Sequence, residues 1–170
     1  MSDNDVPDGD ICRPCGMCSD GTIFDYGRLE PDEIARAQEF GITVIEVDRP
    51  EGATPAIQFP CPRHSLAGCS VYDRRFAVCR RFRCETLIAL EAGEIDAGEG
   101  HRRVHEAKNA LAALRPHLLP GETLPEARQR EGKTSAAGPE ALFLFRLWAL
   151  DTVLDRWFRK SSARRREPLA

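Results

Sequence analysis

The chain has 170 residues, of which 42% are hydrophobic and 30% are charged, and its formal net charge is −3 at pH 7. This length predicts one domain with appendages, and the small negative charge gives no general attraction to nucleic acid. The longest apolar run, residues 141–150, is interrupted by Arg146 and is far shorter than the ~20 residues that cross a bilayer. Neither specific nucleic-acid binding nor a transmembrane segment is therefore predicted.

The first third of the chain begins with an aspartate-rich stretch, which predicts a flexible acidic lead-in over residues 1–10. A cysteine-rich turn follows over residues 12–19, because its proline and glycine allow the backbone to curl. A helix is predicted to begin at residues 30–33, Glu-Pro-Asp-Glu, since proline suits the first helical position and acidic groups suit the positive end of a helix. Gly41 is expected to end it.

The middle of the chain mixes short elements. Residues 42–47 alternate weakly and predict a strand, and residues 48–55 form a loop rich in turn formers. The prolines on both sides of Cys61 exclude a helix interior there. Residues 69–72 are predicted to be extended or turn-like, and residues 76–91 are predicted to be helical.

The last part of the chain is predicted to be mainly α-helical. Residues 101–115 place apolar side chains on one helix face, within a helical extension over residues 93–120. Residues 121–138 are poor in apolar side chains and are predicted to be a linker. Residues 139–160 are predicted to form a strong helix, and residues 161–170 to form a basic tail.

The helix at residues 139–160 has too many apolar side chains for a single stripe, and a helix that is apolar all round is normally buried. We therefore expect it to be a docking helix. It would pack on the helices at residues 101–115 and 30–40, or form an interface with a protein partner or a second copy of the chain. The basic residues beyond it leave association with a membrane surface as a further alternative.

The strongest signal is the crowding of all seven cysteines into residues 12–84, with none in the rest of the chain. They are Cys12, Cys15, Cys18, Cys61, Cys69, Cys79 and Cys84. A domain of this length can bury enough apolar surface without covalent cross-links, so the crowding predicts disulfides or bound metal. The acidic N-terminal residues do not resemble a secretory signal, and an odd number leaves one thiol over, so we expect metal binding in the cytoplasm. The elements then predict a small, loop-rich α+β fold, with a metal-centred cysteine domain over residues 11–92 followed by an α-helical half.

The first three cysteines, Cys12, Cys15 and Cys18, have two residues between neighbours, and three thiolates on one loop can converge on one cofactor. Zinc usually takes two ligands from such a turn, whereas three match the corners of a cubane cluster. A [4Fe–4S] cluster is therefore the favoured cofactor, with zinc as the alternative. The other four cysteines would complete this centre or form a second one, and His64, three residues after Cys61, is a further candidate ligand.

The order of these cysteines resembles the YkgJ-like cysteine-cluster family, which is described as a zinc- or iron-chelating CxxCxxCC domain. The resemblance covers about residues 12–84. Its most specific part is the closing string Tyr72-x2-Arg75-x3-Cys79-Arg80-x-Phe82-x-Cys84.

The resemblance implies a metal bound by the cysteines, with Arg75 and Arg80 beside it, where their charge would stabilise thiolates. Two positions depart from the family pattern. Ser19 replaces the second member of a Cys-Cys pair, so one potential ligand is missing. Phe76 stands where the family has proline, a position that serves the turn rather than the metal.

Outside the cysteines, the sequence shows no credible pair of nucleophile and base. We therefore expect a metal-binding accessory protein whose centre supports redox chemistry or the modification of a partner protein. A structural zinc module used for interaction is the alternative. Related domains occur in flagellin lysine-N-methylases, which implies methyl transfer to a protein or peptide as a third possibility. The glycine-containing stretch at residues 93–100 is acidic, however, and would repel a phosphate.

Overall fold

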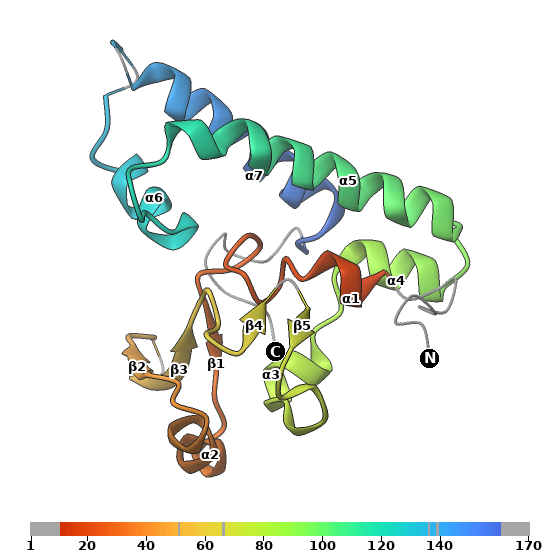
Figure 1. Cartoon of the computed structure of the whole chain (residues 1–170), viewed down its shortest axis with the longest axis vertical. Helices are drawn as coiled ribbons and strands as arrows, with labels where there is room; N and C mark the ends of the chain where they lie inside the picture. Colours follow the sequence, from red (N-terminus) through yellow and green to blue (C-terminus); the bar gives the residue numbers. More distant parts are fainter. Residues whose placement is uncertain (1–10, 51, 66, 136, 139, 161–170) are drawn as a thin grey trace. The chain divides into compact units, whose positions relative to one another are not determined.

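The computed structural model describes residues 11–50, 52–65, 67–135, 137–138 and 140–160. The predicted lead-in and basic tail lie outside the described residues. The chain divides into two compact units that alternate along the sequence (Figure 1). Within the described residues, unit 1 contains residues 11–16, 83–118 and 134–160, and unit 2 contains residues 17–82 and 119–133. The units therefore do not follow the predicted order of a cysteine half and a helical half.

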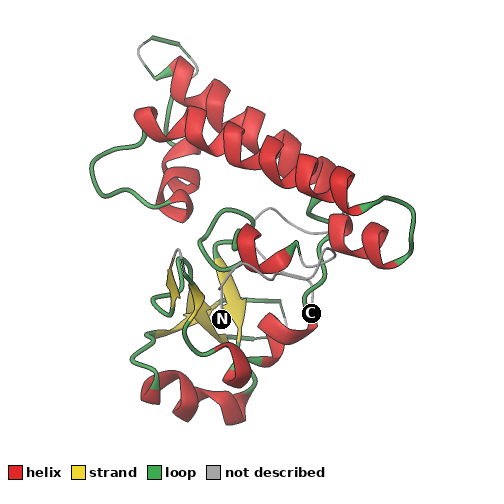
Figure 2. Ribbon diagram, turned by 45° about the vertical axis from the view of Figure 1, so that its right-hand side comes forward, coloured by secondary structure: helices red, strands yellow, loops and turns green. Residues whose placement is uncertain are grey.

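Unit 1 is built from helices (Figure 2). They are α1 (Cys12–Cys15), α4 (Glu85–Glu91), α5 (Ala97–Leu114), the 3-10 helix η3 (Arg115–His117) and α7 (Ala141–Trp157). The helix predicted at residues 101–115 begins earlier, because the Asp96 carboxylate accepts a hydrogen bond of 2.7 Å from the Glu99 amide and caps the first turn of α5.

α7 packs along α5, which is one of the docking modes expected for residues 139–160. The buried side chains include Val104, Ala107 and Leu111 of α5 and Leu144, Leu147 and Leu154 of α7. Within this chain, however, only one face of α7 is buried. Leu142, Phe145 and Trp148, spaced by three residues, expose 47%, 58% and 45% of their surface.

Polar contacts fix the C-terminal end of α7. The buried Arg159 guanidinium lies 2.9 Å from a carboxylate oxygen of Asp151 and 2.9 Å from one of Asp155. The Thr86 hydroxyl of α4 donates a hydrogen bond to the Trp157 carbonyl. Buried charges are tolerated when they are paired in this way. The ion pairs of Arg159 therefore lie at the end of α7 itself, and the Thr86 hydrogen bond joins that end to α4.

Unit 2 holds all the strands among the described residues, with short helices between them (Figure 2). In chain order its elements are β1 (Tyr26–Arg28), η1 (Pro31–Glu33), α2 (Ile34–Glu39), β2 (Val44–Val47), β3 (Thr54–Gln58), β4 (His64–Ser65), β5 (Gly68–Cys69), η2 (Tyr72–Arg74), α3 (Ala77–Arg81) and α6 (Leu124–Glu131). The first three strands form an antiparallel sheet in the order β1-β3-β2, and β4 and β5 form a separate hairpin. The predicted α+β fold class is confirmed.

The sheet differs from the sequence prediction in two of its three strands. β2 lies within the strand predicted at residues 42–47, but β1 and β3 were not predicted. Ala56 and Ile57 in β3 are fully buried, and Gly27 in β1 has close neighbours. A Cβ atom on Gly27 would lie 3.1 Å from the Phe59 ring and 3.3 Å from Val78, so a glycine suits this packing. The single helix predicted over residues 76–91 is instead two helices, α3 and α4, in different units.

The predicted linker at residues 121–138 contains a packed helix, α6, which corrects that prediction. Thr123 and Glu126 form a capping box at its N-terminus. Arg128, only 2% exposed, donates hydrogen bonds to the Asp25 carboxylate at 2.9 Å and to the backbone carbonyls of Gly21 at 3.1 Å and Thr22. The low apolar content of the segment was misleading, because a buried arginine anchors this helix.

The sequence analysis predicted no transmembrane segment, and the helices of the structure can be compared with that prediction. Among the described residues, every helix is too short or too polar to cross a bilayer.

Candidate metal centre

The seven predicted ligands are divided between the two units. Cys18, Cys61, Cys69 and Cys79 belong to unit 2, and Cys12, Cys15 and Cys84 belong to unit 1. All seven lie among the described residues, and no disulfide bond joins any of them. The four cysteines of unit 2 come from three separate stretches of chain, so their grouping depends on the fold of that unit.

The turn that begins at Cys61 connects two of these stretches. The Cys61 amide donates a hydrogen bond of 2.8 Å to the Ser19 carbonyl, which brings the residue after Cys18 against this turn. The His64 amide donates a hydrogen bond of 3.0 Å to the Cys61 carbonyl, and the backbone of Arg63 and His64 lowers the pKa of the Cys61 thiol, although burial raises it more. Amide donors directed at a sulfur stabilise its thiolate, and they surround the sulfur ligands of many metal centres. The Cys61 turn is therefore suited to hold a thiolate.

The hairpin of β4 and β5 positions the third thiol. Its antiparallel register pairs His64 with Cys69, and the Ser70 amide bonds to the Arg63 carbonyl at 2.9 Å. A hairpin this short has little stability by itself. It nevertheless sets Cys69 opposite His64, the further ligand candidate, and close enough to Cys61 for the charge on either sulfur to oppose that on the other.

The fourth thiol, Cys79, lies on α3, whose N-terminus is held by a buried side chain from η1. The Glu33 carboxylate, 4% exposed, accepts a hydrogen bond of 2.8 Å from the Ala77 amide and also pairs with Arg36. Phe76 precedes the helix and is buried, with a φ of −64°. Proline would adopt the same φ, so phenylalanine keeps this backbone conformation and adds a ring to the core.

Electrostatics shows that the four thiols of unit 2 are neighbours. Burial raises the pKa of the Cys79 thiol to about 12, and Cys18, Cys61 and Cys69 each add to the rise. Burial also raises the pKa of the Cys61 thiol, where Cys69 contributes. The protein around the sulfur of Cys18 likewise raises the pKa of its thiol, although Cys18 is exposed as a residue. Because Cys18 is partly in contact with water, the pKa of the Cys79 thiol reports more clearly on the surroundings of the four thiols.

Arg75 opposes these shifts. Its guanidinium lowers the pKa of both Cys18 and Cys79, although less than burial raises each. It stacks 3.5 Å from the centre of the Tyr72 ring and donates a hydrogen bond of 2.8 Å to the Tyr72 carbonyl. Arg80 donates to the Arg75 carbonyl. The closing string of the sequence thus forms a local structure that holds one positive charge close to two thiols.

The remaining three cysteines lie on helices of unit 1. The Cys84 sulfur accepts a hydrogen bond of 3.4 Å from the Leu87 amide and caps the N-terminus of α4. Cys12 and Cys15 begin and end the single helical turn α1, which Gly16 terminates with a φ of 68°. The three cysteines predicted to share one loop and one centre, Cys12, Cys15 and Cys18, are therefore divided between the units.

The four thiols of unit 2 are neighbours without forming an assembled ligand set. In the part of the chain that the structure describes, no three His, Cys, Asp or Glu side chains converge closely enough to hold a metal ion. The chemistry of the donors nevertheless fits a soft or borderline metal, since all four are sulfurs. The amides of the Cys61 turn and the charge of Arg75 would support their ionised form.

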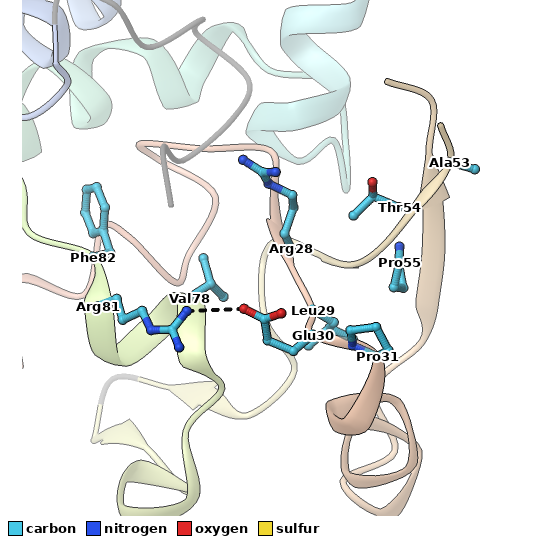
Figure 3. Close-up of a pocket in the computed structure, with 10 residues that line it drawn as sticks. All are labelled: Arg28, Leu29, Glu30, Pro31, Ala53, Thr54, Pro55, Val78, Arg81 and Phe82. Atoms are coloured by element: carbon cyan, nitrogen blue, oxygen red, sulfur yellow. Dashed lines mark hydrogen bonds and ion pairs between the residues drawn. The ribbon is translucent and has the colours of Figure 1, made fainter. Parts of the chain in front are cut away.

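A hollow of about 330 Å³ lies beside α3, also within unit 2 (Figure 3). Val78, Arg81 and Phe82 line it from the region of α3, and Arg28 and Leu29 line it from the end of β1. Arg81 and Glu30 face one another across 3.2 Å, and both side chains are more than half exposed. No pattern in the sequence indicated this hollow, because its residues come from three separated segments.

Comparison with protein-family models gave no match, and neither curated proteins nor solved structures gave a similar protein. The resemblance to the YkgJ-like family therefore stays a prediction based on the cysteines and the closing string.

Proposed function

We propose that this chain is a metal-binding accessory protein whose centre is held by Cys18, Cys61, Cys69 and Cys79. The observation that carries the proposal is that Cys18, Cys61 and Cys69 all raise the pKa of the Cys79 thiol, and that Cys69 raises the pKa of the Cys61 thiol, within one unit. Four thiols from separated segments are unusual neighbours in a domain without a disulfide, and a metal ion is the common reason for such a group.

Four neighbouring thiols of this kind would bind a cation. With a pKa of about 12, the Cys79 thiol keeps its proton at neutral pH while the site is empty of positive ions. A bound metal would replace that proton and cancel the repulsion among the sulfurs, because metal ligation deprotonates thiols. In this proposal the Cys61 turn orients one sulfur, and Arg75 supplies a positive charge beside two others.

The favoured cofactor is a [4Fe–4S] cluster, which would supply one-electron transfer and support redox chemistry or modification of a partner protein. The second candidate is a structural zinc ion. It is favoured by the number of donors, since four thiolates complete the tetrahedral shell of a closed zinc site. With zinc, the centre would hold the fold of unit 2 for use in interaction.

Anaerobic purification followed by metal and sulfide analysis tests the proposal. We expect one tightly bound centre per chain, brown with sulfide for the cluster and colourless without sulfide for zinc. The Cys79→Ser variant should lose most of the metal, whereas Cys84→Ser should keep it, since Cys84 caps a helix of unit 1. A folded wild-type protein without metal, or equal retention in both variants, would contradict the proposal.

Arg75 and Arg80 offer a second test of the same centre. The Arg75→Gln/Arg80→Gln variant removes the charge that favours the thiolates, so we expect faster loss of metal to a chelator, or a shifted reduction potential for a cluster. Arg83→Gln is the matched control, because Arg83 pairs with Glu91 in unit 1 at 3.3 Å. Identical behaviour of both variants would mean that Arg75 and Arg80 act only on the protein surface.

The outer face of α7 is the part of residues 139–160 that we propose for contact with a protein partner or a second copy. Its support is the exposed stripe of Leu142, Phe145 and Trp148. Replacement of all three by serine should leave unit 1 folded, since the opposite face carries the packing on α5. Sedimentation of both proteins tests a second copy: a wild-type dimer that the variant loses supports this surface, and monomers in both cases exclude self-association there.

A further inference from the structure

The cysteine pair on α1 has a geometry of its own. Cys12 and Cys15 are separated by Arg13 and Pro14 in one helical turn. Side chains three residues apart on a helix are neighbours, with Cβ atoms about 5–6 Å apart. Small local adjustment brings such a pair to the Cβ separation of about 3.5–4.5 Å that a disulfide needs.

The two thiols also differ in accessibility. Cys12 is exposed, whereas Cys15 is half-buried. An accessible thiol beside a more protected one is the arrangement in which the first thiol attacks an external disulfide and the second resolves the product. The Cys-x-x-Cys spacing is typical of proteins that perform this exchange.

α1 is held in place on both sides within unit 1. Ile11, directly before it, is buried, and a Cβ atom on Gly100 of α5 would lie 3.4 Å from the Ile11 side chain. The Lys108 ammonium of α5 donates a hydrogen bond of 2.6 Å to the Pro14 carbonyl. This anchoring means that oxidation of the pair would not require unit 1 to refold.

We propose that Cys12 and Cys15 form a redox-active dithiol that exchanges with external disulfides, separately from the metal centre. The proposal rests on the proposed function in one respect: four thiols of unit 2 complete a centre, so these two are not needed as ligands. Its substrate class is a disulfide, either of a small molecule or of a protein.

The exchange balances without a further reagent. The Cys12 thiolate attacks one sulfur of the external disulfide, forms a mixed disulfide, and releases the other sulfur as a thiolate, which takes up the proton that Cys12 lost. Cys15, deprotonated in turn, attacks the Cys12 sulfur and expels the second thiol. The external disulfide gains two electrons and two protons, and the Cys12–Cys15 pair loses the same number.

The test uses the full-length protein, purified anaerobically with its metal and equilibrated with mixtures of oxidised and reduced dithiothreitol. Alkylation after denaturation in chelator, digestion with trypsin and mass spectrometry then locate the oxidised cysteines. Arg13 is followed by proline, so Cys12, Cys15 and Cys18 remain on one peptide that ends at Arg28. We expect this peptide to lack two hydrogens and to carry a single alkyl group, on Cys18.

Four variants sharpen the result. Cys12→Ser and Cys15→Ser should each abolish the internal disulfide. The Cys12→Ser/Cys15→Ser double variant should bind the same amount of metal per chain as the wild type. Cys84→Ser, which changes a thiol of the same unit, should form the disulfide as the wild type does. Serine is a good N-cap, so this control keeps the start of α4 intact.

The outcomes separate this inference from the function proposed above. Loss of half or more of the metal in the double variant would make the pair ligands, and would overturn this inference while the metal centre stands. A disulfide that includes Cys18, or none under fully oxidised dithiothreitol, would also overturn it. A Cys12–Cys15 disulfide in a wild-type protein without metal would support the redox pair and overturn the metal centre.

Discussion

The two units differ in how their buried charged side chains are paired. Unit 1 places aliphatic side chains between two long helices, with the Arg159 and Asp151 pair at one end. Unit 2 has strands of two to five residues and also buries apolar side chains, but its buried charges, Arg128 and Glu33, bind segments that lie far away in the sequence. Apolar packing distributes stability over many weak contacts, whereas a buried charge concentrates it on one partner. Single changes should therefore damage unit 2 at a few defined points.

Each unit also carries its own spectroscopic probe. Both tryptophans, Trp148 and Trp157, lie in unit 1, and both tyrosines, Tyr26 and Tyr72, lie in unit 2. Tryptophan fluorescence thus follows unit 1, and hydrogen exchange of individual peptides follows each unit separately.

The largest expected effect comes from Arg128→Ala. It leaves the Asp25 carboxylate and two backbone carbonyls of unit 2 without their donor, and breaking a buried ion pair costs about 3–5 kcal/mol. We expect the exchange protection of residues 17–82 to fall by more than that of α5 and α7. Arg81→Ala, which breaks an exposed pair with Glu30, should change the free energy of unfolding by about 1 kcal/mol or less. Equal losses in the free energy of unfolding for Arg128→Ala and Arg81→Ala would contradict the conclusion that unit 2 depends on its buried charges.

Leu147→Ala tests the apolar interior of unit 1. Leu147 is fully buried, so the truncation should lower the free energy of unfolding by about 3 kcal/mol through lost burial and the cavity left behind. Urea unfolding followed by tryptophan fluorescence measures it. Leu142→Ala on the exposed face of the same helix should stay within about 0.5 kcal/mol of the wild type. A large effect at Leu142 would show that its face is covered in solution.

Glu33→Ala should cost about 2 kcal/mol, because the Ala77 amide loses its acceptor while the site stays buried. The start of α3 should fray, and in metal-free protein Cys79 should react faster with an alkylating reagent. Asp32→Ala, at the exposed neighbouring position, is the matched control. Unchanged alkylation of Cys79 in Glu33→Ala would mean that the carboxylate does not position α3.

The smallest effect is expected for a pair of glycine substitutions in unit 2. Gly27→Ala should destabilise the protein by about 1 kcal/mol, since its new methyl group would lie 3.1 Å from Phe59. Gly132→Ala has helical dihedrals and a nearest neighbour 4.0 Å away, so it should stabilise by about 0.4–1 kcal/mol. The thermal unfolding temperatures of the two variants should shift in opposite directions. Shifts of the same sign would contradict the close packing described around Gly27.

The sequence predicted the parts of the fold that have strong local signals. The α+β class, the start of the helical region after Glu30, β2, and the long helices α5 and α7 all follow from capping residues and apolar periodicity. β1, β3 and the hairpin of β4 and β5 were not predicted, since strands of two to five residues are too short to show a period. α6 was missed for another reason: its anchor, Arg128, is a charged residue that a hydrophobic pattern counts as exposed.

The sequence and the structure group the cysteines differently, and the ligand set stays a prediction. Crowding of cysteines indicated a common chemistry, but sequence spacing grouped Cys12, Cys15 and Cys18, whereas the unit boundary falls between Gly16 and Met17. Spacing reports which thiols are close along the chain. The backbone hydrogen bond from Cys61 to Ser19 and the capping of α3 by Glu33 join distant segments, and no local pattern contains them. No pattern in the sequence indicated that the Cys84 sulfur caps α4, and whether Cys84 is also a ligand stays a prediction.

The ion pair between Asp25 and Arg128 joins residues 103 positions apart, which affects biosynthesis. At the usual translation rate of about 5–20 residues per second, Asp25 leaves the ribosome roughly 5–20 s before its partner. Cys18 is made before Asp25, and the other three thiols of unit 2 are made within that interval, before the helix that anchors the segment after Cys18 exists. The nascent chain therefore exposes a set of unshielded thiols for seconds, and a reducing environment or early delivery of metal would matter most at that stage.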